Sequence, residues 1–71
     1  MDRTAVRSRE IAIVGYDEEL ATLEIAFRRG GVYRYQDVPV EVHRELLKAS
    51  SIGTYFTDNI KEKYSYEKVN G

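Results

Sequence analysis

Two tyrosines that flank an arginine are the residues of this chain best suited to binding a ligand. Tyr33, Arg34 and Tyr35 follow the Gly30–Gly31 pair. Aromatic rings stack on bases and other planar groups, and a guanidinium group attracts phosphate. On a strand, the two tyrosines point to one face and the arginine points to the other. Which of these side chains meets a ligand therefore depends on the elements that position them.

Other cationic and aromatic side chains of the chain could complete such a site. Six of the eight aromatic residues are tyrosines, and a buried tyrosine keeps its hydroxyl near water or a polar partner. The candidate residues for binding a ligand or nucleic acid are Tyr33, Arg34 and Tyr35, with Arg28 and Arg29 nearby and with Lys61, Lys63 and Tyr64 closing the other side. The alternative is that Tyr16, Tyr33 and Tyr35 serve only the core, and the sequence leaves both interpretations open.

Catalytic residues are sparse. His43 is the single histidine, and helical spacing directs Glu41 and Glu45 away from it, so we expect it on the solvated face of a helix. The chain has no cysteine, and Ser50–Ser51 is better explained as a helix cap than as a nucleophile. We therefore expect no enzymatic activity, no metal and no cofactor.

Length and charge limit the classes of function. The chain has 71 residues, which suffice for one small domain, and its 11 Lys and Arg against 12 Asp and Glu give a net charge of −1. A dedicated duplex-DNA binder normally has a pI above about 9, whereas the pI here is about 5.8. A local basic face can still attract an anion. No apolar run is long enough for a signal peptide or a membrane span, so we expect a cytoplasmic protein without membrane contact.

Hydrophobic periodicity predicts three strands followed by two helices. Leu23, Ile25 and Phe27 alternate with polar residues, which is the clearest strand signal in the chain. Ile52, Phe56 and Ile60 recur at helical spacing. The predicted strands lie near 9–16, 21–28 and 32–36, and the predicted helices lie near 39–49 and 52–61. This pattern predicts an α+β fold, a three-stranded antiparallel meander (β-β-β-α-α) with two helices packed on one face.

The ends of the chain carry weaker signals. Residues 1–8 show no periodicity, and we expect a flexible N-terminal arm ahead of a single domain over residues 9–71. The segment 61–66 repeats the Tyr-x-Tyr spacing and could add an edge strand.

The length of the glycine hairpin decides where the tyrosines point. With a three-residue loop, Phe27 lies opposite Tyr33 and Ile25 lies opposite Tyr35, so both tyrosines share the core face. A two-residue loop would instead turn Arg34 into the core. Burying an unpaired guanidinium costs far more than burying a tyrosine ring. We therefore predict the three-residue loop, with Arg34 facing outward.

Several short motifs together resemble one known family. They are Gly15-Tyr16-Asp17, Tyr33-x-Tyr35, Val38-Pro39 and Gly53-x-Tyr55-Phe56, followed by Ile60 and Tyr64. In this order and spacing they resemble the KTSC domain over about residues 8–66. That domain is found at the C-terminus of some lysyl-tRNA synthetases and as free-standing small proteins of bacteria and phages. The resemblance implies RNA binding as one function.

Three functions fit these residues, and all three describe a non-catalytic binding module. The first is RNA or single-strand binding through Tyr33, Arg34, Tyr35 and the Lys61/Lys63 end. The second is a self-associating protein that binds a small, nucleotide-like anion between subunits. The third is a protein-interaction adaptor. Near-neutral charge favours the second and third, while the family resemblance favours the first.

Overall fold

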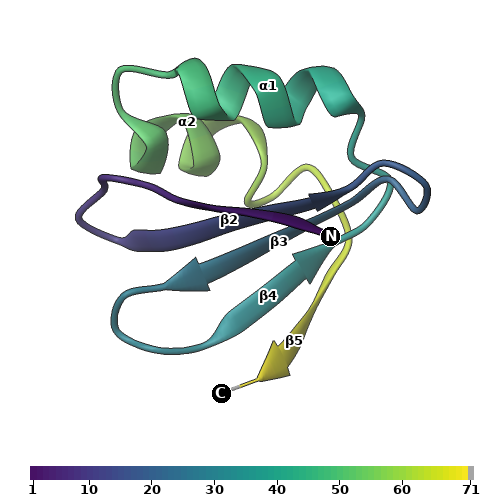
Figure 1. Ribbon diagram of the computed structural model, residues 1–71, viewed down its shortest axis with the longest axis horizontal. Coiled ribbons are helices and arrows are strands. Elements are labelled where there is room, and N and C mark those ends of the chain that lie inside the picture. Colours follow the sequence, from purple (N-terminus) through teal and green to yellow (C-terminus); the bar gives the residue numbers. More distant parts are fainter. Residues whose placement is uncertain (71) are drawn as a thin grey trace.

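The protein is an antiparallel sheet with two helices on one of its faces (Figure 1). The computed structural model describes residues 1–70, and Gly71, the last residue of the predicted domain, lies outside them. The described residues form a five-stranded sheet in which every strand neighbours the next one in sequence. The elements are β1 (Asp2–Ala5), β2 (Ile11–Asp17), β3 (Thr22–Phe27), β4 (Val32–Tyr35), α1 (Val40–Lys48), α2 (Ile52–Asn59) and β5 (Tyr66–Asn70). The α+β class and the meander are thus correct, but the predicted three strands become five.

The core lies between the helices and the central strands. The predicted core residues Leu23, Ile25, Leu46, Phe56 and Ile60 are buried there, while Phe27 and Val42 pack against the cluster and stay partly exposed. Alternation places the apolar residues of β3 on the helix-covered face, and helical spacing turns Leu46 and Phe56 toward them. Ser51 caps α2 as predicted, because its hydroxyl accepts a hydrogen bond from the Thr54 amide at 3.3 Å.

The two outer strands differ from the predictions. Residues 1–8 were expected to be an arm, but β1 pairs antiparallel with β2, with Asp2 opposite Tyr16 and Ala5 opposite Ile13. The Arg28 guanidinium holds the following segment by donating to the carbonyls of Val6 and Ser8. The C-terminal edge strand does exist, but it overlaps the predicted segment 61–66 only at Tyr66, where it starts, and it runs on to Asn70. All of β1 and residues 66–69 of β5 are exposed, and most of their residues are polar, so the two strands lack the apolar alternation that reveals a strand.

The β3–β4 hairpin has the predicted loop length but a different register. Phe27 donates its amide to the Gly31 carbonyl at 3.0 Å, which leaves three loop residues, 28–30. Gly30 and Gly31 have φ of 113° and 92°, values that side chains disfavour. The loop starts one residue earlier than predicted, so Ile25 lies opposite Tyr33 and Leu23 opposite Tyr35. The register is shifted by two residues, and the two tyrosines keep the predicted helix-covered face.

None of the helices in the described part of the chain has the length and apolar character needed to cross a membrane.

Candidate ligand-binding site

A cavity of about 580 Å³ opens at the end of the sheet where the β3–β4 hairpin meets the start of β2 and the C-terminal half of α2. Its walls combine aromatic rings with cationic side chains. The lining residues are Arg9, Glu10, Ile11, Phe27, Arg28, Arg29, Gly30, Tyr33, Tyr35, Phe56, Thr57 and Lys61. This size falls in the range of about 300–1,000 Å³ that is typical of small-molecule sites.

Five aromatic rings form a closed ring of contacts at the cavity. Ring centroids are 5.5 Å apart for Phe27–Tyr33, 5.6 Å for Phe27–Phe56 and 5.5 Å for Tyr35–Phe56, all edge-to-face. Tyr66 of β5 completes the ring, at 5.2 Å from Tyr35 and 5.8 Å from Tyr33. Edge-to-face pairs are favourable because the positive edge of one ring meets the negative face of the other. The aromatic wall is therefore held in place before any ligand arrives.

Tyr35 lies deepest of the tyrosines in the cavity wall. Its side chain is buried, and burial, helped by the nearby Tyr66 and Tyr33, raises the pKa of its hydroxyl to about 12. The hydroxyl therefore stays protonated at neutral pH. It can donate a hydrogen bond to a ligand but cannot act there as an anionic base.

The cavity has an excess of positive charge. Arg9, Arg28, Arg29 and Lys61 line it, with Glu10 as the single carboxylate among the lining residues. Arg28 is already engaged, since its guanidinium donates to the Ser8 carbonyl and, at 2.9 Å, to the Val6 carbonyl. The side chains of Arg9, Arg29 and Lys61 are exposed, and among residues 1–70 they form no ion pair. These three cations are free to meet an anion.

The structure brings five of the eight candidate residues to this cavity. Tyr33, Tyr35, Arg28, Arg29 and Lys61 line it, while Arg34, Lys63 and Tyr64 do not. Lys63 is exposed in the turn after α2, and Tyr64 packs against the core instead.

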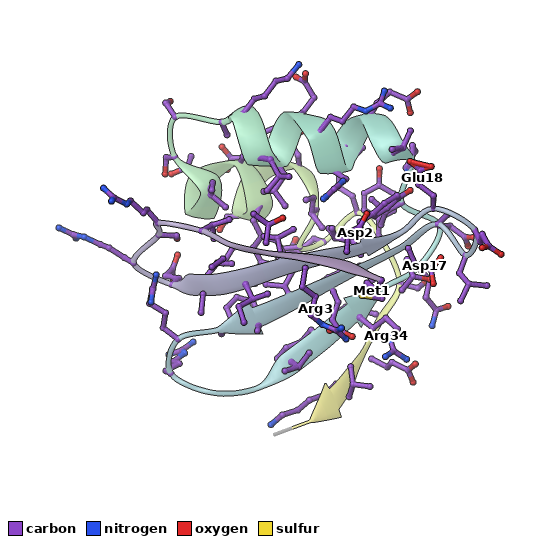
Figure 2. The ribbon with its side chains drawn as sticks, viewed as in Figure 1. Met1, Asp2, Arg3, Asp17, Glu18 and Arg34 are labelled. Atoms are coloured by element: carbon purple, nitrogen blue, oxygen red, sulfur yellow. The ribbon has the colours of Figure 1, made fainter. Side chains whose placement is uncertain are left out.

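Arg34 lies on the opposite face of the sheet and is not free. It faces away from the helices, as predicted, but its Nη2 donates to Glu24 Oε2 at 3.2 Å. Arg3 reaches the other oxygen, Oε1, at 3.1 Å (Figure 2). The Glu24 side chain is only 11% exposed, so the two arginines neutralise an almost buried carboxylate. Tyr33, Arg34 and Tyr35 therefore cannot contact one ligand together.

Several residues of the site were not among the candidates. Phe27 and Phe56 were predicted only as core residues, and Arg9, Glu10 and Thr57 were not singled out. Strand and helix periodicity predicts which aromatic side chains lie on the same face of the sheet. It does not predict that the packing at one end of the sheet leaves a cavity.

His43 is not on the solvated face where the sequence placed it. Its ring stacks on Tyr16 with centroids 4.7 Å apart, and its Nε2 is buried without a hydrogen-bond partner among the described residues. Burial, assisted by the positive charge of Arg44, lowers the pKa of His43 below its ordinary value of 6.5, although Asp2 and Glu18 act in the opposite direction.

This environment predicts a pH-dependent stability. The unfolded chain binds a proton on His43 at higher pH than the folded chain does, so the free energy of unfolding should fall as the pH drops below about 6.5. His43→Phe keeps an aromatic ring on Tyr16 and removes the titration, and it should flatten the decline. Urea unfolding between about pH 7.5 and 5 tests this. If the free energy of unfolding fell equally with pH in the wild type and in His43→Phe, the pH dependence would not come from His43.

Comparison with known proteins connects this fold to a family. The sequence profile of the KTSC domain matches residues 7–64, which is most of the chain. The chain belongs to the KTSC domain family. The crystal structure of a KTSC domain protein from Yersinia pestis matches with a TM-score of 0.94 and 38% sequence identity, over 97% of each chain. The whole architecture, including the outer strands, is therefore shared with a solved KTSC domain.

Other relatives show the domain alone and within a larger protein. An uncharacterized protein of Stutzerimonas stutzeri is 40% identical over 97% of this chain and 99% of its own length. A lysine–tRNA ligase of Trichormus variabilis is 43% identical over 76% of this chain. The matched segment makes up 10% of that ligase, so the KTSC domain is a small part of the enzyme.

Proposed function

We propose that this KTSC domain is a non-catalytic module that binds single-stranded RNA, with one nucleotide entering the cavity beside Tyr33. The observation that carries the proposal is the combination of an aromatic wall with three unpaired cations around one cavity. Aromatic rings that stack a base, combined with a cationic path for the backbone, are the two elements of single-strand recognition.

The aromatic wall supports stacking of a base. Tyr33 is half-buried and held edge-to-face by Phe27, so its ring is oriented while part of it stays accessible. Stacking of one base on an aromatic side chain contributes about 1–3 kcal/mol. A cavity of about 580 Å³ is matched to a single nucleotide and not to a duplex.

Three cations at the rim of the cavity supply a local attraction for phosphate. The whole chain has a net charge of −1, so attraction of a polyanion must be local. Arg9, Arg29 and Lys61 provide it at the rim of the cavity. Arg34 has no part in this, because Glu24 engages it on the other face.

The lysine–tRNA ligases among the relatives favour RNA over other anions. The domain occurs in enzymes whose name gives tRNA as their substrate, and such a role places this protein in the cytoplasm. A free nucleotide-like anion is the second candidate, because the same rings and cations would bind it. The cavity lies within one chain, so neither ligand requires a pocket between subunits.

Lys61 and Lys63 provide a matched pair for testing the proposal. Both are exposed and they lie two residues apart, but only Lys61 lines the cavity. In fluorescence anisotropy titrations with a labelled single-stranded RNA, we expect Lys61→Ala to weaken binding and to reduce the slope of log K against log salt by about 0.7. We expect Lys63→Ala to bind like the wild type. Equal effects of the two changes would show that the cavity is not the site.

A substitution at Tyr33 tests the stacking part. Tyr33→Leu keeps an apolar side chain but removes the stacking surface, and it should weaken RNA binding by about 5-fold to 150-fold. Competition by mononucleotides separates the two candidate ligands, since a mononucleotide that competes as well as the oligomer would favour the small anion. Circular dichroism confirms that the variant is folded.

A further inference from the structure

No helix of the described residues covers the face of the sheet opposite α1 and α2. Both helices lie on one side of the sheet (Figure 1), and on the other side the Met1 and Arg3 side chains lie against Gly15. Ile13 and Val69 are 38% and 41% exposed, although an outward-facing strand position is usually polar. The RNA-binding cavity is on the helix-covered side, so this face is free for a different role.

Strand register arranges the side chains of this face in two parallel rows. One row runs across all five strands through cross-strand partners and is charged, namely Arg3, Gly15, Glu24, Arg34 and Glu67. The next row contains the apolar residues Ala5, Ile13, Ala26 and Val32, whose register partner in β5 is Asn70. Val69 lies beside this row, where the register of β5 shifts. The alanines keep the apolar row low, whereas the Met1 and Arg3 side chains occupy the space above Gly15 in the charged row.

We propose that a second copy of this chain covers this face, related by a two-fold axis that runs parallel to the strands above β3. About this axis, β1 of one chain lies over β5 of the other. Each row of one chain then faces the same row of the other chain. The positive end of the charged row, Arg3, then meets the partner's Glu67, and this contact occurs twice by symmetry. Glu24, which Arg3 and Arg34 of its own chain neutralise, faces its own copy on the axis. In the apolar row, Ile13 faces the partner's Val32, and Ala26 faces its own copy on the axis. Aligned stacking of two sheets is a common way of forming a core.

The charges of the face favour a copy of the chain over a nucleic acid. Arg3 and Arg34 are balanced by Glu24 and Glu67, so the charged row has no net charge to attract a polyanion. The chain as a whole has a net charge of −1, and two copies repel each other little. Glu67 forms no ion pair within the described residues, which leaves it available to the partner's Arg3.

The small size of the face argues for a weak association. Five strands cover about 24 Å across and five residues cover about 17 Å along, which gives roughly 400 Å² per chain. Standard interfaces bury about 800 Å² per partner. The dimer should therefore be weak, with a dissociation constant in the micromolar to millimolar range.

Ile13 and Leu20 provide the test of association. Sedimentation equilibrium of the wild type from about 10 µM to about 1 mM should show the mass rising from one chain toward two. Ile13→Lys places a charge in the apolar row and should keep the protein monomeric. Leu20→Lys is the control, since Leu20 is 69% exposed in the β2–β3 turn, away from this face. A wild type that stays monomeric at the highest concentration, or equal effects of the two variants, would overturn the proposal.

A single cysteine tests the position of the two-fold axis. The chain has no cysteine, so Ala26→Cys gives two thiols that meet on the axis. A short bismaleimide should link them rapidly into a covalent dimer, and Leu20→Cys should link slowly. If Ala26→Cys associates by sedimentation but does not link faster than Leu20→Cys, the two copies meet in another arrangement and the proposed axis is wrong.

Discussion

Replacing Tyr35 by alanine should cost about 3–5 kcal/mol of the free energy of unfolding. The Tyr35 side chain is 3% exposed and its ring packs edge-to-face on Phe56 at 5.5 Å. Truncation of a buried aromatic residue removes its transfer free energy and leaves a cavity. A domain of this length is stable by roughly 4–10 kcal/mol in total, so the variant should be close to unfolding. Tyr66 would also lose the neighbour that orients it against the core.

The comparison variant for this experiment is Tyr35→Phe. It keeps the ring and removes only the hydroxyl, so we expect it to change stability by less than about 1.5 kcal/mol. Urea denaturation of the three proteins at neutral pH measures both differences. A loss of less than about 1 kcal/mol for Tyr35→Ala would mean that Tyr35 is not part of the core. The side chains of β4 would then point to the opposite faces of the sheet from those described.

The central part of the fold follows from hydrophobic periodicity. Leu23 and Ile25 alternate with polar residues, so the strand and its buried face could be predicted. The odd number of loop residues in the hairpin could also be predicted, because an even number would have buried the Arg34 guanidinium. The exact register did not follow, since Gly30 and Gly31 both adopt positive φ and the sequence does not say which of them ends the loop.

The outer strands carry no such pattern. Asp2 and Thr4 face the helix-covered side of β1, yet both are exposed and polar. Their strand is held by pairing with β2 and by Arg28, and both interactions depend on residues far away in sequence. Tertiary context of this kind overrides local propensity.

Part of the candidate site could be predicted from the sequence. Alternation on β4 placed Tyr33 and Tyr35 together, and the structure puts both in the wall of the cavity. The same alternation sends Arg34 and Glu24 to the other face, but it does not reveal that Glu24 is buried there. Arg9 comes to the site through the bend before β2, which no local signal reveals.

The cluster around Glu24 should show graded losses of stability when its members are removed. Glu24 is the member on which both arginines converge, and its side chain is 11% exposed against 38% for Arg34 and 56% for Arg3. Glu24→Ala leaves two facing guanidinium groups without an anion, including the Arg34 Nε, which is buried and has no partner among the described residues. We expect a loss of about 2 kcal/mol, below the value for a fully buried pair because the arginines are partly solvated.

The two arginine variants should lose less stability than Glu24→Ala, and the variant of the more exposed arginine should lose the least. Arg34→Ala leaves Glu24 paired with Arg3 and should cost about 1 kcal/mol, which exceeds the effect of an ordinary surface change. Arg3→Ala removes the most exposed member and should cost about 0.5 kcal/mol. Urea denaturation at low and high salt measures the series, and salt should reduce the Arg3 effect most because solvent screens that charge best. If Glu24→Ala proved as mild as Arg3→Ala, the buried carboxylate would not be what holds β1, β3 and β4 together on this face.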